Sequence, residues 1–261
     1  MLKEYFIDNE CFENTIEHLE KDWKDSKNKV FLFRSGVNGE SAKQFYSDFA
    51  SKFGRFCNYA EDAKEGNRNC QRTGEVWMEI RNDNSIKDAY RHSTNAQPLH
   101  TDGSYIPGFP TSLLVCQSNV EKGGETIFVE PKQILADIKD YSDSMYNFVL
   151  NVELLHQRSG DSRCDKIFKL QDDLIKVNYN YYCVTNDLPD SIKQLNEYFL
   201  NYLVEVEQLK RTNVDVVSVK LLPGDAVIWK DDEVLHGRHS FVAQSDSERF
   251  IWKCGFEVDF E

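Results

Sequence analysis

The segment 98–105, PLHTDGSY, places a histidine two residues before an aspartate, a spacing that suits two ligands of one metal ion. In an extended chain the side chains of residues i and i+2 point to the same side, so His100 and Asp102 can both reach one ion. With 6 His and 44 acidic residues among 261, chance alone supplies roughly one such pair. A second pair, His18 and Glu20, lies in a stretch with helical periodicity, where residues two apart diverge by roughly 200° and cannot bind together.

A metal site built on His100 and Asp102 needs a third ligand, and two imidazoles with one carboxylate on one face of an octahedron suit Fe(II). The best candidate is His236, because the sequence VLHGRHSF is strand-like and follows the turn Pro223-Gly224-Asp225. His239 is an odd number of residues further along the strand and should face away. The remaining histidines are His92, in a predicted loop that could cover a substrate together with Arg91, and His156.

Arg249 follows His236 on what the sequence predicts to be an adjacent strand. A guanidinium there could hold a carboxylate through two parallel hydrogen bonds, a role for which lysine is a poor substitute. An arginine in a strand also commonly packs its stem and pairs with a surface acid, so the position alone leaves both interpretations open. From spacing alone, His100, Asp102 and His236 form a candidate metal site, and Arg249 is a candidate anion-binding residue.

The elements that must position these residues are mostly strands. Segments rich in β-branched and aromatic residues predict strands at 29–36, 74–80, 111–118, 125–129, 147–156, 173–182, 214–222, 225–229, 233–241 and 249–258. Helical periodicity predicts helices at 11–26, 39–54, from Pro131 onward, and at 190–208. This order favours a β-sandwich or open barrel supported by helices over a parallel βαβ sheet. Aromatic residues such as Tyr105 and the run NYNYY (178–182) could line a pocket or belong to the core, and Cys116 is expected to pack inside.

Composition limits the possible partners and compartment. A chain of 261 residues with a net charge of −13 can bury a large core, but it lacks the basic surface that a nucleic acid or an anionic membrane attracts. No segment is apolar enough to predict a membrane span or a signal peptide. The 7 cysteines are scattered without a Cys-x2-Cys pair, which predicts reduced thiols in the cytoplasm. We expect one domain over 1–261, and the sequence indicates no oligomeric state.

Several short motifs occur together in a characteristic order: His100-Thr101-Asp102, Gly123-Gly124-Glu125-Thr126, Pro223-Gly224-Asp225, His236-Gly237-Arg238 and Arg249. In this order, from about residue 97 to 253, the sequence resembles the taurine dioxygenase and clavaminate synthase superfamily of Fe(II)- and 2-oxoglutarate-dependent oxygenases. Each motif is weak alone, whereas the ordered set is specific. Residues 1–70 match only in size and helix content.

The resemblance implies a mainly β fold with flanking helices around a double-stranded β-helix, or jelly roll. Residues 1–70 would form a helical N-terminal buttress, and about 74–258 the jelly-roll core with helical insertions. His100, Asp102 and His236 would be the catalytic iron ligands, while Arg249 and the Thr126 hydroxyl would bind the distal carboxylate of 2-oxoglutarate. The resemblance also implies O2 as a cosubstrate and hydroxylation of an unactivated C–H bond in a small molecule, such as a free amino acid or a specialised metabolite.

Two departures from the family pattern concern the substrate. Relatives commonly carry a basic, Asn-containing segment before the distal histidine, whereas this chain has Lys230-Asp231-Asp232-Glu233. If the three acidic side chains lie at the rim of the pocket, they favour a cationic substrate such as a basic amino acid; otherwise they form a solvated turn. Some relatives have an arginine where this chain has Lys253, which is either a substrate anchor or an exposed side chain.

The sequence thus predicts a non-haem Fe(II) and 2-oxoglutarate-dependent dioxygenase that acts on a small molecule. Desaturation or cyclisation by the same cofactors remains open. An alternative of another class is a non-enzymatic jelly-roll protein that binds a metal or a ligand, but a structural metal site has no need for the carboxylate-binding pair Arg249 and Thr126.

Overall fold

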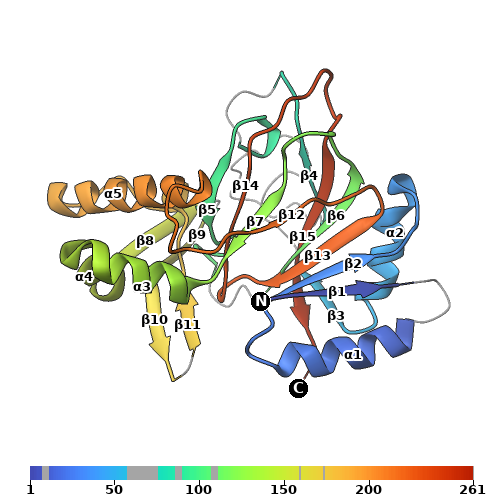
Figure 1. Ribbon diagram of the computed structural model, residues 1–261, viewed down its shortest axis with the longest axis horizontal. Helices are drawn as coiled ribbons and strands as arrows, with labels where there is room; N and C mark the ends of the chain where they lie inside the picture. Colours follow the sequence, from blue (N-terminus) through green and yellow to red (C-terminus); the bar gives the residue numbers. More distant parts are fainter. Residues whose placement is uncertain are drawn as a thin grey trace.

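Two antiparallel sheets face each other at the centre of the protein (Figure 1). We describe a computed structural model over residues 1–7, 12–57, 76–85, 90–106, 111–158, 160–172 and 174–260. The larger sheet has the order β1-β2-β13-β6-β15-β3, and β4 also pairs with β15. Its strands are β1 (Leu2–Phe6), β2 (Val30–Arg34), β3 (Gly54–Cys57), β4 (Met78–Arg81), β6 (Thr111–Ser118), β13 (Asp225–Lys230) and β15 (Phe250–Val258). Only the β1–β2 pair of this sheet is parallel.

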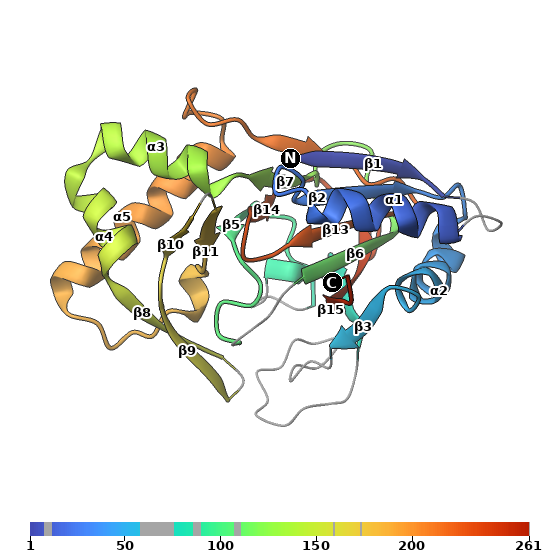
Figure 2. The same cartoon turned by 90° about the horizontal axis from the view of Figure 1, so that it is seen from below.

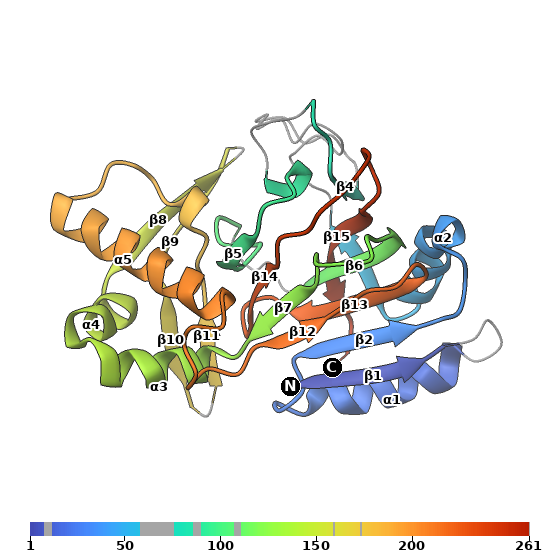
Figure 3. The same ribbon diagram turned by 45° about the horizontal axis from the view of Figure 1, so that its top comes forward.

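The smaller sheet carries most of the predicted site residues. Its order is β12-β7-β14-β5, formed by β12 (Val217–Val219), β7 (Thr126–Val129), β14 (Leu235–Arg238) and β5 (Gln97–His100). All of its pairings are antiparallel. Figure 3 shows this sheet between the larger sheet and a group of helices.

Five α-helices occur in the described residues, in two groups. Helices α1 (Phe12–Lys24) and α2 (Gly39–Ala50) cover the outer face of the larger sheet. Helices α3 (Pro131–Tyr141), α4 (Asp143–Asn151) and α5 (Asp190–Glu207) lie at the other end of the molecule, beside the hairpins β8–β9 and β10–β11 (Figure 2). These hairpins comprise β8 (Glu153–Arg158), β9 (Asp161–Lys166), β10 (Phe168–Gln171) and β11 (Leu174–Val177). Short 3-10 helices, η1 (Tyr90–His92) and η2 (Tyr181–Cys183), border the pocket described below.

Alternating side chains assign the two faces of the larger sheet. On β2, Phe31 and Phe33 pack against α1 and α2, while Val30 and Leu32 face the smaller sheet. This period of two is the pattern expected for a strand that is covered on both sides. Apolar residues on the other face of the smaller sheet pack against α3, α4 and α5. Apolar side chains therefore fill the space between the two sheets and the space between the smaller sheet and the helices.

The prediction of a mainly β protein with flanking helices is confirmed. The helices predicted at 11–26, 39–54, from Pro131 and at 190–208 correspond to α1, α2, α3 and α5. Residue 11 and residues 74–75, at the start of two predicted elements, lie outside the described residues. Strands β1, β3, β5, β9 and β10 were not predicted, and all are short or polar at alternate positions.

The strand predicted at 147–156 is wrong in its first half, because residues 143–151 form α4. The Ser142 side chain caps this helix by accepting a hydrogen bond from the Met145 backbone N–H at 3.3 Å. Met145, Phe148 and Val149 then fall on one helical face and are buried. Packing at a helical period thus outweighs the strand propensity of these residues.

The strand predicted at 173–182 is shorter than expected, ending at Val177 in β11. The Asn180 side chain accepts a hydrogen bond from the Tyr182 backbone N–H at 3.2 Å, which starts η2. The strand predicted at 214–222 is likewise reduced to Val217–Val219. Among the described residues, no helix has the length and apolar character needed to cross a membrane.

His156 on β8 is fully buried, and its ring packs edge-on against Tyr179 at a centroid distance of 6.4 Å. Burial lowers the pKa of this imidazole to about 4. His156 is therefore neutral in the folded protein at neutral pH. As the pH falls below about 6.5, the unfolded chain binds a proton that the folded chain does not, so folding loses stability until about pH 4.

We therefore expect the free energy of unfolding to fall between pH 6.5 and pH 4.5 with a contribution from His156 of up to about 1.4 kcal/mol per pH unit. The variant His156→Gln should show a shallower dependence, measured by urea denaturation at each pH. His18→Gln, which removes an exposed imidazole from α1, is the matched control. Equal slopes for wild type and His156→Gln would contradict the prediction.

Candidate metal centre

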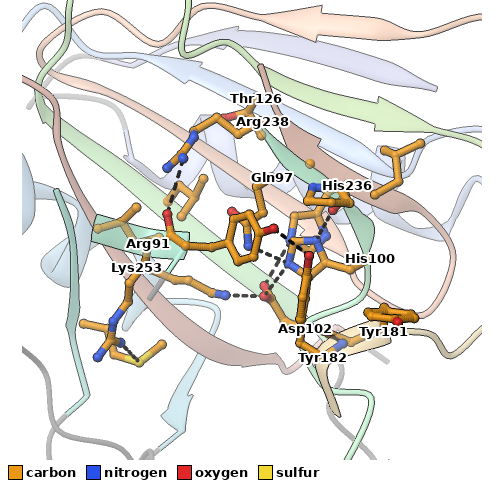
Figure 4. Close-up of a pocket in the computed structure, with 18 of the residues that line it drawn as sticks. Arg91, Gln97, His100, Asp102, Thr126, Tyr181, Tyr182, His236, Arg238 and Lys253 are labelled. Carbon is orange, nitrogen blue, oxygen red and sulfur yellow. Dashed lines mark hydrogen bonds and ion pairs between the residues drawn. The ribbon is translucent and has the colours of Figure 1, made fainter. Parts of the chain in front are cut away.

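The structure brings His100, Asp102 and His236 together in the gap between the two sheets (Figure 4). His100 ends β5, and Asp102 follows it in a turn. His236 on β14 is paired directly with His100 across the antiparallel ladder. One potential ligand atom from each residue lies within 4.8 Å of the others, and the side chains are only 7–8% exposed. The three predicted ligands therefore share one buried location.

A backbone carbonyl orients the His100 ring. Its Nδ1 lies 2.8 Å from the Pro98 carbonyl oxygen and can only donate there, which places the lone pair on Nε2. Nε2 faces Asp102 Oδ1 at 3.6 Å and the Gln97 amide nitrogen at 3.1 Å. A ring held through Nδ1 keeps the Nε2 lone pair, which here faces the Gln97 amide nitrogen, suited to a metal ion, and this is the usual arrangement of a metal ligand.

Two side chains hold the Asp102 carboxylate. The Ser112 hydroxyl donates to Oδ2 at 2.6 Å, and the Lys253 ammonium forms an ion pair with Oδ1. Burial alone would raise the pKa of Asp102, but Lys253 and the neighbouring imidazoles outweigh burial and hold this pKa well below its usual value. Asp102 is therefore an anion at neutral pH. A lysine cation already compensates part of its charge.

Asp231 lies beneath the metal motif and is 2% exposed. Its Oδ1 accepts hydrogen bonds from the Asp102 backbone N–H at 3.0 Å and the Trp229 indole N–H at 3.1 Å, and its Oδ2 accepts from the Gly103 N–H at 3.0 Å. Oδ1 is also 3.6 Å from His236 Nδ1. One carboxylate thus connects the turn that carries Asp102 to the strand that carries His236. Burial and the nearby Asp102 carboxylate raise the pKa of Asp231 to about 7.

Gly237 allows the two histidine strands to approach. A Cβ atom at this position would lie 2.7 Å from the Gln97 carbonyl oxygen on β5, closer than such atoms approach in proteins. Position 237 therefore accommodates glycine only, and its neighbour His236 can pair with His100.

The donor set fits a divalent transition metal. Burial lowers the pKa of His236 to about 4, so its imidazole is neutral and able to coordinate at neutral pH. Two neutral imidazoles and one carboxylate are the ligands of the facial triad of non-haem Fe(II) sites. In the part of the chain that the structure describes, these residues form the one His, Cys, Asp and Glu cluster with metal-binding spacing.

The three residues line a pocket of about 330 Å³. This volume is at the lower end of the range for small-molecule sites. Among the described lining residues, Asp102 is the one acidic side chain. The basic side chains of the lining are Arg91, Arg158, Arg238, Arg249 and Lys253. The pocket of this acidic protein is therefore itself rich in positive charge.

Arg249 and Thr126 line the same pocket and are 2% and 3% exposed. Arg249 Nε lies 3.4 Å from the Gly124 carbonyl oxygen. Gly124 has a φ of +72°, and a Cβ there would come within 3.1 Å of Arg249 Nε, so this glycine leaves room for the guanidinium. Burial lowers the pKa of Arg249 to about 10, which still leaves it a cation at neutral pH.

Other predicted candidates divide between pocket and core. Tyr105, Arg91, Tyr181 and Tyr182 line the pocket. The Tyr182 hydroxyl lies 2.6 Å from the hydroxyl of Tyr90, which also lines the pocket, so this contact joins η2 to η1 across it.

The remaining candidates lie outside the pocket lining. His92 is 2% exposed and bonds the Arg81 carbonyl at 2.9 Å, and His239 pairs with Glu207 at 2.8 Å. Tyr179 and Cys116 belong to the cores.

The hypothesis that acidic residues 231–233 form the rim of the pocket is wrong. Asp231 points inward and binds backbone N–H groups. Asp232 and Glu233 pair with Lys176 at 3.0 Å and 2.8 Å. None of the three is among the described residues that line the pocket. The argument for a cationic substrate therefore loses its basis, while Lys253, expected to be either an anchor or exposed, is a buried pocket residue.

Sequence reasoning missed Ser112, Gln97 and the role of Arg238. Ser112 and Gln97 contact Asp102 and His100, yet their separation from the motif in sequence gives no sign of it. Arg238 follows His236 by two residues, so strand periodicity could have placed it on the same face.

Comparisons with known proteins agree with this geometry. The sequence profile described as taurine catabolism dioxygenase TauD, TfdA family matches residues 17–254. A uridine-5'-phosphate dioxygenase from a Streptomyces species is 23% identical over 169 residues, which is 61% of this chain and 61% of that protein. The match thus spans less than two thirds of this curated relative's length.

Two solved structures share the fold. An asparagine oxygenase in complex with Fe(II), 2S,3S-3-hydroxyasparagine and succinate superimposes with a TM-score of 0.63 at 12% identity, covering 94% of this chain and 78% of that one. The non-haem iron oxygenase OrfP in complex with Fe and alpha-ketoglutaric acid gives a TM-score of 0.63 at 11% identity, with 94% and 78% covered. Because the family profile covers most of the chain, the family expected from the ordered motifs is confirmed: this protein belongs to the TauD, TfdA family of dioxygenases.

Proposed function

We propose that this protein is an Fe(II)- and 2-oxoglutarate-dependent oxygenase that hydroxylates an unactivated C–H bond of a small molecule. One observation carries the proposal: the ligand atoms of His100, Asp102 and His236 lie within 4.8 Å of one another in a pocket that also contains Arg249 and Thr126. A metal triad and a buried guanidinium in one cavity suit a metal together with an acidic cosubstrate. Membership of a dioxygenase family supports this combination.

In this proposal His100, Asp102 and His236 would hold the iron, and a set of two histidines and one carboxylate suits a metal that also binds small molecules. Fe(II) with 2-oxoglutarate and O2 supplies the oxidising power for the C–H bond and yields succinate and CO2. The chain orients these ligands. The Pro98 carbonyl fixes the His100 tautomer, the Ser112 hydroxyl orients the Asp102 carboxylate, and Asp231 holds the backbone N–H of residue 102. Arg249 and Thr126 bind the distal carboxylate of 2-oxoglutarate.

The charge of the pocket favours a substrate with an acidic group. The described lining contains five basic side chains and one acidic one, and the latter is a proposed iron ligand. Lys253 is the basic residue nearest the triad, since it contacts Asp102 directly. We therefore propose a substrate with an acidic group, in place of the cationic substrate suggested by residues 231–233. The tyrosines at positions 90, 181 and 182 supply an aromatic wall.

We further propose that the two facing sheets form the double-stranded β-helix of this family and that residues 1–261 are one domain. In that arrangement α1 and α2 would be the helical N-terminal buttress expected over 1–70, although the same region also contributes β1, β2 and β3 to the larger sheet. A cytoplasmic location suits the cysteines, since the five in the described residues are free thiols. The alternative of a non-enzymatic binding protein finds no support in a family of dioxygenases.

The activity is tested directly by measuring succinate formation in the presence of Fe(II), 2-oxoglutarate and O2 with a panel of small acids, including amino acids and nucleotides. Mass spectrometry of each reaction should detect a product heavier by one oxygen atom. Neutral and cationic compounds of similar size serve as the comparison set. Substrate-stimulated succinate formation with cationic compounds alone would refute the acidic-substrate assignment.

Removal of a metal ligand should abolish turnover and weaken metal binding. For His236→Ala we expect at least about a 100-fold loss of Mn(II) affinity, since even changes to residues behind a ligand typically cost 10–100-fold. Anaerobic calorimetry measures this without relying on activity. His18→Ala, on the exposed face of α1, is the control and should bind metal like wild type. Full metal affinity in His236→Ala would exclude His236 as a ligand.

Asp231→Asn tests the carboxylate beneath the motif. Both carboxylate oxygens accept N–H bonds, so an amide NH2 group would face a donor and leave at least one buried N–H unpaired. We expect about a tenfold or larger loss of Mn(II) affinity. The adjacent variant Asp232→Asn removes the same charge from a half-exposed side chain and should have no effect. Identical affinities for the two variants would rule out this role for Asp231.

Arg249→Leu should weaken 2-oxoglutarate binding by about 30-fold or more, because a charge-assisted pair is worth roughly 2 kcal/mol. Thr126→Ala should cost about fivefold, as it removes one hydroxyl. Gly124→Ala should also reduce affinity, since its methyl group would displace the Arg249 side chain. Dissociation constants from anaerobic calorimetry of the Fe(II)-loaded protein measure all three. An unchanged constant in Arg249→Leu would end the assignment of the cosubstrate site.

A further inference from the structure

Arg238 is a buried arginine whose hydrogen bonds are only half accounted for. It is 3% exposed and lines the pocket. Its Nη2 donates to the carbonyl oxygens of Tyr90, Ser93 and Asn95, at 3.3, 2.8 and 2.6 Å (Figure 4 shows the first of these). Nε and Nη1 are buried as well, and no atom of the described residues accepts a hydrogen bond from either. Nη2 therefore holds the segment 90–95, while Nε and Nη1, which point in different directions, lack an acceptor among the described residues.

Arg238 belongs to the same region as the proposed cosubstrate site. Arg238 on β14 is paired directly with Thr126 on β7, and both side chains lie at the top of the pocket in Figure 4. The guanidinium carbons of Arg238 and Arg249 lie 5.1 and 5.5 Å from the centroid of one ring, that of Phe241. Arg249 also has a buried Nη1 without an acceptor among the described residues. Two guanidiniums thus present buried N–H groups without an acceptor among the described residues, in the pocket that the Thr126 side chain also lines.

Two buried cations so close together are unfavourable without an anion. Burial, and then the neighbouring Arg249, lower the pKa of Arg238 to about 9. A carboxylate offers about four acceptor positions and could accept hydrogen bonds from Nη1 of each guanidinium and from the Thr126 hydroxyl. Asp102, the one acidic side chain of the described lining, is already held by Ser112 and Lys253. The described lining therefore offers Arg238 no free carboxylate, whereas a ligand can bring one.

We infer that Arg238 is a second guanidinium of the cosubstrate site, which binds the distal carboxylate of 2-oxoglutarate through Nη1 alongside Arg249 and Thr126. This inference rests on the proposed function and adds a residue to it. Nη2 of Arg238 keeps its bonds to the segment 90–95, which contributes Tyr90 and Arg91 to the pocket wall. The same side chain then contacts the cosubstrate and positions the wall beside it.

A contact to the distal carboxylate predicts selectivity between two ligands. 2-Oxopentanoate has the same number of carbon atoms as 2-oxoglutarate but ends in a methyl group. Wild type should bind 2-oxoglutarate far more tightly than 2-oxopentanoate, because only the dicarboxylate pairs with the guanidiniums. If Arg238 touches that carboxylate, its removal reduces the difference. If Arg238 only supports the segment 90–95, its removal weakens both ligands equally.

The experiment measures both dissociation constants by anaerobic calorimetry of the Fe(II)-loaded full-length protein. We expect Arg238→Gln to weaken 2-oxoglutarate binding by about tenfold or more and to change 2-oxopentanoate binding by less than about threefold. Arg238→Lys keeps the charge but not the planar guanidinium, so its affinity for 2-oxoglutarate should lie between those of wild type and Arg238→Gln. This variant also covers the case in which the glutamine variant does not fold. Arg55→Gln, at a strongly exposed ion pair with Glu257, has the same change in net charge as Arg238→Gln and should bind both ligands like wild type.

The outcomes separate this inference from the proposed function. If wild type does not bind 2-oxoglutarate, the proposed function fails. If Arg249→Leu loses affinity while Arg238→Gln and Arg238→Lys bind 2-oxoglutarate like wild type, the cosubstrate site stands and Arg238 is not part of it. An equal loss for both ligands in the Arg238 variants also overturns the inference and leaves a purely structural role. Only a loss of affinity that is confined to 2-oxoglutarate supports the inference.

Discussion

The antiparallel pairing of β14 with β5 on one side and β7 on the other is the constraint on which the rest of this site depends. It sets His236 opposite His100 and Arg238 opposite Thr126. Side chains two residues apart on a strand share a face, so one register places a metal ligand and a buried guanidinium in the same cavity. A shift of one residue would turn both to the helical side of the sheet. The polar groups around the ladder, above all Asp231 and Ser112, refine positions that this register has already set.

Charge is distributed unevenly between the protein as a whole and its pocket. The chain carries a net charge of −13, yet the described pocket lining has five basic side chains against one acidic side chain. Buried cations of this kind are costly unless anions accompany them. Lys253 finds one in Asp102, whereas Arg238 and Arg249 retain unpaired nitrogen atoms among the described residues. The interior is thus arranged for acidic ligands even though the overall charge would repel them at long range, a repulsion that salt screens over about 10 Å.

The ordered motifs in the sequence identified five residues that the structure gathers in one pocket. Strand pairing keeps such short motifs next to one another in space, whatever the length of the loops between them. The same reasoning failed at residues 231–233. Three consecutive acidic residues look like a solvated turn, and only the folded chain places the N–H groups of residues 102 and 103 over Asp231. Helix α4 was missed for a related reason: its apolar residues suit either a strand or a helix, and contacts with α3 and α5 select the helix. The local sequence gives only the residue types. The burial of Asp231 and the helical conformation of α4 depend on contacts with residues far away in the sequence.

The close approach at Gly237 has a consequence for how this chain tolerates change. The Cβ of any other residue would meet the Gln97 carbonyl oxygen at 2.7 Å, so β14 would have to move away from β5. Such a shift alters no ligand, charge or hydrogen-bonding group, yet it separates the two imidazoles that the ladder holds side by side, whose ring centroids are 4.3 Å apart. A single methyl group outside the coordination sphere can therefore remove the coordination geometry. A substitution at position 237 would therefore abolish metal binding even though all three ligand residues are still present.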